Sequence, residues 1–238
     1  MSSPTIYGLW NFSQWDGDKI ALIDPDEKAW TRRELIEEGN KIAHGLRAMG
    51  LKKGDTVAAM LPNCAQYLAI NLAVMQTGMF LAPLNWHLAA NEVAYILQDS
   101  DAKAFFFHHE TSGVANAACE TMGYPSSQAF CLGGHNSYER FIADQPSTLP
   151  DDRTAGMVMY YTSGTTGHPK GVRRRVPHID PDTNATNFTF LLMLFGIQPE
   201  ANNVHFCGSP PLPHRRDELG NQLTSLWSLR GTAPKMGR

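Results

Sequence analysis

The chain has 238 residues with a formal net charge of −3, and 42 % of its residues are hydrophobic. This length and apolar content are enough for one large domain or two small ones with a buried core. The small net charge gives no reason to expect a nucleic acid or an anionic membrane as a partner.

The cysteines and the apolar segments predict a cytoplasmic protein. Four cysteines lie far apart and form no Cys-x-x-Cys pair, so neither a disulfide framework nor a zinc knuckle is expected. No basic-then-apolar leader opens the sequence, and its longest strongly apolar run, residues 188–197, is too short to span a bilayer. We therefore expect reduced thiols and no transmembrane segment.

The first predicted elements are a hairpin and a helix. Residues 19–23 and 28–30 are two short strand-like runs separated by turn residues. Thr31 and Glu34 have the spacing of a capping box, and apolar residues then recur at helical spacing until Gly50. This pattern predicts a helix that begins after Thr31 and ends near Gly50.

Strand and helix patterns alternate through the rest of the chain. The predicted strands are residues 57–61, 79–84, 104–107, 129–132, 157–161 and 204–207. The predicted helices run from Pro62 to Gln76 and over residues 91–98, 111–122, 138–142 and 182–196, and residues 145–153 are a loop. This alternation favours βαβ units and a largely parallel sheet, an α/β fold. The adjacent His108 and His109 have no third partner in this pattern, so we interpret them as surface residues and not as a metal site.

Residues 160–171 read YYTSGTTGHPKG and are typical of a phosphate-binding loop. Hydroxyl groups donate hydrogen bonds, glycines let backbone N–H groups approach a ligand, and Lys170 adds a positive charge. The loop also follows a predicted strand, where open α/β sheets bind their ligands. Pro169 precedes Lys170 and Gly171 follows it, which differs from the Walker A spacing and argues against a P-loop NTPase.

The same string resembles the signature loop of the adenylate-forming superfamily, which includes acyl-CoA synthetases, luciferases and the adenylation domains of peptide synthetases. Upstream, Pro62-Asn63, Gly78 and the segment Pro83-Leu84-Asn85-Trp86 look like the corresponding positions of fatty-acid-activating acyl-CoA synthetases. On this resemblance, residues 1–209 are expected to form an incomplete N-terminal (adenylation) domain.

The resemblance also implies a reaction. A carboxylate attacks the α-phosphate of ATP, pyrophosphate leaves, and the thiol of coenzyme A displaces AMP from the acyl-adenylate. The implied ligands are therefore ATP, Mg²⁺, coenzyme A and a small-molecule carboxylic acid, with no nucleic acid.

The resemblance assigns roles to individual residues. The expected nucleotide-binding residues are Thr162, Ser163, Gly164, Thr165, Thr166, Gly167 and Lys170. Among these, Thr165 would contact Mg²⁺, and Lys170 would be the catalytic residue that neutralises the departing pyrophosphate. His214, in the string Pro-Leu-Pro-His, would lie beside the acyl-binding pocket, although a proline stands where the family has an aromatic residue.

After His214 the resemblance stops. We predict that residues 210–238 are a divergent, disordered tail, and a frameshift near Pro210 is our hypothesis for its origin. The family's acidic magnesium partner, adenine segment, ribose aspartate and mobile C-terminal domain all lie beyond this point. We therefore expect a truncated chain that is inactive alone, and a non-catalytic nucleotide- or phosphate-binding module stays open as the alternative.

Overall fold

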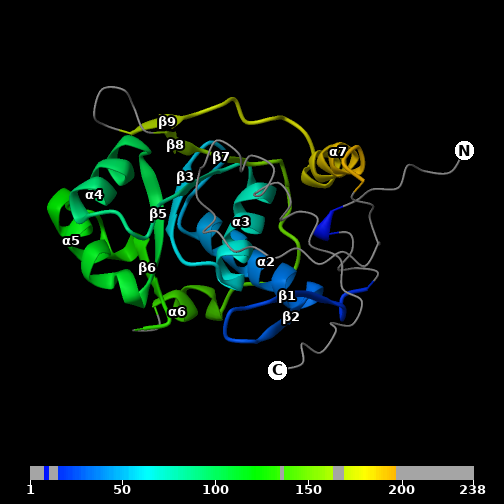
Figure 1. The fold of residues 1–238 in the computed structure, drawn as a ribbon, viewed down its shortest axis with the longest axis horizontal. Coiled ribbons are helices and arrows are strands. Elements are labelled where there is room, and N and C mark those ends of the chain that lie inside the picture. The colour runs from blue at the N-terminus through cyan, green and yellow to red at the C-terminus, as the bar shows by residue number, and fades with distance from the viewer. Residues whose placement is uncertain (1–7, 11–15, 135–136, 163–168, 197–238) are drawn as a thin grey trace, which may run out of the picture.

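A five-stranded parallel sheet forms the centre of the protein (Figure 1). This computed structural model describes residues 8–10, 16–134, 137–162 and 169–196. In spatial order, the sheet consists of β6 (Ala129–Leu132), β5 (Ala102–His108), β3 (Thr56–Met60), β4 (Phe80–Pro83) and β7 (Met157–Val158). All four neighbouring pairs are parallel, which confirms the predicted α/β fold with a largely parallel sheet.

Helices cover both faces of this sheet. One face carries α2 (Arg32–Ala48), α3 (Ala65–Thr77) and α6 (Ser137–Ala143), and the other carries α4 (Ala90–Asp99) and α5 (Ser112–Met122) (Figure 1). Successive strand residues serve opposite cores, because side chains alternate along a strand. In β3, Val57 and Ala59 belong to the first core and Ala58 and Met60 to the second.

Smaller elements complete the described part. The strands β1 (Ile20–Ile23) and β2 (Ala29–Thr31) pair antiparallel, as do β8 (Tyr160–Thr162) and β9 (Lys170–Val172). The remaining elements are the 3₁₀ helices η1 (His109–Thr111) and η2 (Ser126–Gln128) and the helix α7 (Pro181–Met193). Within the described ranges, no helix is long and apolar enough to cross a lipid bilayer. The predicted strand 204–207 and the predicted tail 210–238 lie outside these ranges.

The capping box at the start of α2 is confirmed. The Thr31 hydroxyl accepts a hydrogen bond from the Glu34 amide at 3.1 Å, and the Thr31 amide donates to the Glu34 carboxylate at 2.7 Å. Both contacts satisfy backbone groups that a helix start leaves without partners. The helix ends at Ala48, and Gly50 follows with a φ of 89°.

The start of α3 differs from the prediction. The helix begins at Ala65, not at Pro62, and the Cys64 side chain makes no capping hydrogen bond. The Ala65 amide donates instead to Asp24 Oδ1 at 2.7 Å, and the other oxygen of Asp24 accepts from Trp30 Nε1 at 2.7 Å. A carboxylate 41 residues earlier in the chain therefore caps α3, which a local sequence pattern cannot indicate.

The predicted strand 157–161 is divided between two sheets. Residues of β7 pair with β4 through Phe80 and Leu81, and the Met159 amide makes a further hydrogen bond to Leu81 O at 2.7 Å. From Tyr160 onward the chain pairs with β9 instead. The change of partner places the start of the phosphate-loop motif on a hairpin at the edge of the main sheet.

Candidate functional site

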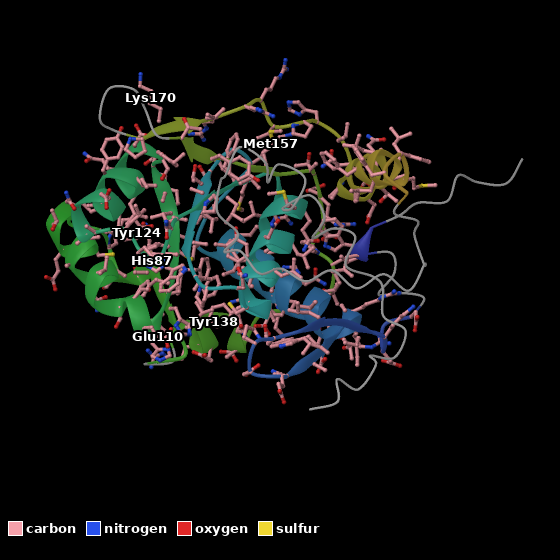
Figure 2. The ribbon with its side chains drawn as sticks, viewed as in Figure 1. His87, Glu110, Tyr124, Tyr138, Met157 and Lys170 are labelled. Atoms are coloured by element: carbon pink, nitrogen blue, oxygen red, sulfur yellow. The ribbon has the colours of Figure 1, made fainter. Side chains whose placement is uncertain are left out.

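The β8–β9 hairpin holds both ends of the predicted phosphate loop. Thr162 and Lys170 lie opposite each other in the antiparallel register, and both are exposed. Lys170 is the first residue of β9, and in Figure 2 it lies at the rim of the molecule. The structure thus brings together the first and last members of the predicted nucleotide-binding set. The other members lie outside the described residues, as does His214: Ser163, Gly164, Thr165, Thr166 and Gly167.

The base of the hairpin is packed. The Tyr161 hydroxyl donates to Asp99 Oδ2 of α4 at 2.7 Å, and burial raises the pKa of Tyr161 above its ordinary value. A Cβ atom at Gly171 would lie 2.3 Å from Met159 Cε and 2.9 Å from the Tyr161 ring. Gly171, the middle residue of β9, therefore lets the strand pack closely against Met159 and Tyr161. Sequence reasoning missed Asp99, because it lies 62 residues from Tyr161.

The segment after β9 contacts the turn before β3 and the strand β4. Arg173 donates to Gly54 O, and its guanidinium lies 4.6 Å from the centre of the Phe80 ring. Five residues later, His178 Nδ1 lies 2.7 Å from Lys53 Nζ. These contacts fix the chain on the far side of the loop to the turn before β3, so both ends of the loop are anchored.

A pocket of about 280 Å³ opens beside the hairpin. Thr162 and Val172 line it from the hairpin, Leu72 and Met75 from α3, and Phe188 from α7. Figure 2 labels Met157, which also contributes to its wall. The lining is mainly apolar, so the pocket suits the apolar part of a small molecule whose polar end reaches the start of the loop.

Two polar features occur around this pocket. Asn71, from α3, lines it and is buried, and its Nδ2 group has no hydrogen-bond partner in the described structure. The helix α7 is joined to α3 through Arg153, which donates to Asp182 Oδ2 at 2.8 Å and to Gln76 Oε1 at 3.2 Å. Burial raises the pKa of Asp182, and the nearby Arg153 opposes that rise. The pocket therefore has one wall whose position depends on a charged pair.

Comparison with known proteins gives the family. A model of the AMP-binding enzyme family matches residues 10–179 of this chain. The chain belongs to the AMP-binding enzyme family. The match includes the hairpin and the complete signature loop, and it confirms the resemblance seen in the sequence.

Two curated relatives of this AMP-binding chain are named as fatty-acid ligases. Long-chain-fatty-acid–CoA ligase FadD13 of Mycobacterium tuberculosis is 35 % identical over 158 residues, covering 64 % of this chain and 31 % of the relative. Fatty acid–[acyl-carrier-protein] ligase ScoC of Streptomyces coeruleorubidus is 38 % identical over 149 residues, covering 60 % of this chain and 27 % of the relative. The chain spans about a third of the length of these relatives.

Solved structures agree on the fold. The inhibitor-bound N-terminal domain of FACL13 from Mycobacterium tuberculosis superposes with a TM-score of 0.72 and 22 % identity, covering 93 % of this chain and 54 % of that one. ATP-bound MatB from Rhodopseudomonas palustris gives a TM-score of 0.66 and 22 % identity, covering 97 % of this chain and 46 % of that one. The AMP-binding chain thus has the fold found in N-terminal domains of acyl-CoA ligases.

Proposed function

We propose that residues 1–209 form the triphosphate-binding N-terminal part of an ATP-dependent acyl-CoA synthetase. The observation that carries this proposal is the pairing of Thr162 with Lys170, which closes the signature loop at its base. Both residues are exposed, so a hydroxyl and an ammonium group are available to a ligand at the mouth of the loop. A hydroxyl donor and a cation suit phosphate oxygens.

In the proposed reaction, a carboxylate oxygen bonds to the α-phosphorus of ATP while the bond to the β-phosphate oxygen breaks. Lys170 would neutralise the charge that develops on the departing pyrophosphate, and the loop N–H groups would hold its oxygens. The thiol of coenzyme A would then attack the acyl carbon, forming the thioester and releasing AMP. Mg²⁺ bound with ATP would supply further charge neutralisation, and Thr165 is the residue proposed to contact it.

The proposed substrate is a fatty or related small-molecule carboxylic acid, with His214 beside it. The names of the relatives FadD13 and ScoC, both fatty-acid ligases, support this class of substrate. A cytoplasmic location also belongs to the proposal. The free thiols of Cys64, Cys119 and Cys131 support it, because reduced cysteines are usual in a reducing compartment.

We further propose that these 238 residues alone bind ATP without forming acyl-adenylate. These residues span about a third of the length of the relatives, which supports this view. Each of the remaining family parts would contribute several kcal/mol of transition-state stabilisation to the adenylation step. The chain by itself would then behave as the alternative predicted from its sequence, a non-catalytic phosphate-binding module.

Calorimetry and pyrophosphate exchange test both statements on the purified chain. We expect ATP to bind with a millimolar dissociation constant, roughly −4 kcal/mol, because the loop grips phosphates and little apolar surface is buried. Pyrophosphate should displace ATP, and adenosine should not. Lys170→Ala should abolish binding, whereas the control Lys41→Ala on α2 should not change it.

Four results would contradict the proposal. Binding that survives Lys170→Ala, or that adenosine displaces, would place the nucleotide elsewhere. Micromolar affinity would show that a larger nucleotide site exists in this chain. Fatty-acid-dependent exchange of labelled pyrophosphate into ATP, above a blank without protein, would show that these residues suffice for adenylation.

A further inference from the structure

Two imidazoles and a carboxylate converge where β5 ends. His108, His109 and Glu110 each offer one ligand atom, and these three atoms all lie within 4.8 Å of one another. His108 Nδ1 lies 3.4 Å from Glu110 Oε2. In Figure 2, Glu110 and Lys170 lie at opposite edges of the molecule, so this cluster is separate from the phosphate loop.

The spacing matches what a tetrahedral zinc ion requires. Zinc binds histidine nitrogen and carboxylate oxygen at about 2.0–2.2 Å, which places neighbouring ligand atoms roughly 3.4 Å apart. The contact between His108 and Glu110 already has this length. The ligand atom of His109 lies no more than 4.8 Å from the other two, so it must approach them by at most about 1.4 Å to reach the tetrahedral spacing. This movement is open to it, because His109 and Glu110 are exposed side chains that can rotate.

Local backbone structure explains why three consecutive residues converge. His108 is the last residue of β5, paired in register with Leu132, and the 3₁₀ helix η1 begins at the next residue. The Thr111 hydroxyl donates to His108 O at 2.9 Å and tightens this turn. Along a continuing strand, by contrast, adjacent side chains would point to opposite faces. The change from strand to 3₁₀ turn therefore puts all three groups on one side.

Gly133 and Gly134 lie beside the imidazole of His109. Gly133 has a φ of 71°, and a Cβ atom there would lie 2.8 Å from His109 Nδ1. A Cβ atom at Gly134 would lie 3.0 Å from His109 Cβ. The chain after β6 therefore passes close to His109, and the absence of side chains at these two positions leaves the space beside its imidazole open.

We propose that His108, His109 and Glu110 bind a zinc-type divalent transition-metal ion, with water completing its coordination. Imidazole nitrogen is a ligand for zinc, whereas Mg²⁺ prefers oxygen ligands, so this site is distinct from the magnesium contact proposed at Thr165. The ion would take the nitrogen lone pair that now accepts a long, 3.5 Å hydrogen bond from the Glu110 amide. His135 lies outside the described residues and is not among the proposed ligands.

The structure places a third group, Glu110, beside the pair that was interpreted from sequence as surface residues, and His109 and Glu110 are indeed exposed. The sequence shows Glu110 next to them, but adjacent residues can share a metal only if the backbone turns. A strand pattern over residues 104–107 gave no sign of a 3₁₀ turn at that point.

Zinc titration by calorimetry tests the proposal on the 238-residue chain. We expect one site with a micromolar dissociation constant. Glu110→Gln, which keeps the shape of the side chain, should weaken binding about tenfold to a hundredfold, and His109→Ala should weaken it by at least as much. Burial raises the pKa values of Cys64 and Cys119 to about 11, so little thiolate is present at these two positions near neutral pH.

Matched controls separate this site from general zinc binding. Glu120→Gln removes an exposed carboxylate from α5, and His44→Ala removes an imidazole from α2; neither should change the zinc affinity. Equal zinc binding by Glu110→Gln, His109→Ala and the unchanged chain would overturn the proposal. Absence of binding at millimolar zinc would overturn it as well.

A second measurement needs no variant. Copper follows the same imidazole ligands as zinc. In air-saturated buffer ascorbate reduces the bound copper, dissolved oxygen is the oxidant, and the reactive oxygen species formed at the metal oxidise the side chains that hold it. Peptide mapping of the treated chain should find oxidised His108 and His109 before the other histidines among the nine. Oxidation that starts at other histidines would show that the metal binds elsewhere and would overturn the assignment.

Discussion

The central sheet and the β8–β9 hairpin are held by different kinds of contact. Every residue of β3 is buried, and helices cover both of its faces. In the hairpin, Thr162 and Lys170 are exposed and Val172 is 41 % exposed. Hydrophobic packing therefore fixes the whole sheet, whereas the hairpin that carries the proposed phosphate loop is held by one buried side chain, Tyr161, together with a few polar contacts and a closely packed glycine. Fold stability and loop placement should be separable by mutation.

The largest expected effect is on the sheet. Phe106 is fully buried in β5, and its ring lies 5.1 Å from that of Phe130 and 5.7 Å from that of Phe141, measured between centroids. Phe106→Ala leaves a cavity among these rings, so we expect a loss of about 3–5 kcal/mol in the free energy of unfolding. Urea denaturation followed by circular dichroism measures it.

An exposed phenylalanine provides the control for this loss. Phe190 on α7 is 54 % exposed, and Phe190→Ala should change the free energy of unfolding by less than about 1 kcal/mol. If Phe106→Ala cost no more than Phe190→Ala, the sheet would not be the main source of stability, and the contrast with the hairpin would fail.

A smaller effect is expected at the hairpin. Tyr161→Phe removes the hydroxyl that donates to Asp99 at 2.7 Å and leaves the ring packed against Gly171. We expect a loss of about 1–2 kcal/mol, because the acceptor is a carboxylate. Amide hydrogen exchange should accelerate in β8 and β9 while β3 stays protected, since the hairpin opens locally.

Tyr124 offers a matched control for Tyr161. Its hydroxyl donates to Ala102 O at 3.1 Å, at the start of β5 and outside the hairpin. Tyr124→Phe removes a similar hydrogen bond, but it should leave exchange in β8 and β9 unchanged. Equal acceleration there in both variants would mean that the hairpin and the sheet open as one unit.

The sheet was predictable from sequence because its signals are local. The buried strands are short apolar runs, and the capping box at Thr31 and Glu34 specifies one helix start by side-chain chemistry alone. The motif likewise marked the phosphate loop, although five of its seven proposed ligands lie outside the described residues.

What escaped prediction depends on contacts between distant residues. Asp24 caps α3 across 41 residues, and Asp99 holds Tyr161 across 62. The division of the predicted strand 157–161 follows from the pairing of Tyr160 with Val172, a choice of partner that the strand's own residues do not encode. The cluster at His108 escaped for a local reason, because a turn of one 3₁₀ helix is not visible in hydrophobic periodicity.

The smallest expected effect is a pH dependence of the free energy of unfolding that arises at Asp182, which joins α7 to α3 through Arg153. Burial raises the pKa of Asp182, and Arg153 opposes the rise without cancelling it. The folded chain therefore binds this proton more tightly than the unfolded chain. The free energy of unfolding should fall as pH rises from the ordinary aspartate value near 4 through the raised pKa, and then level off.

Asp182→Asn isolates this contribution, because asparagine keeps an oxygen that can accept from Arg153 at the observed 2.8 Å. Urea denaturation of both chains between pH 4 and 7 gives the difference in unfolding free energy. The advantage of the unchanged chain over the variant should shrink with rising pH, because only the aspartate must give up a proton while buried. An advantage that grows with pH would show that attraction to Arg153 outweighs burial. The link between α7 and α3 would then be a stabilising ion pair, in contrast to the apolar packing that holds the central sheet.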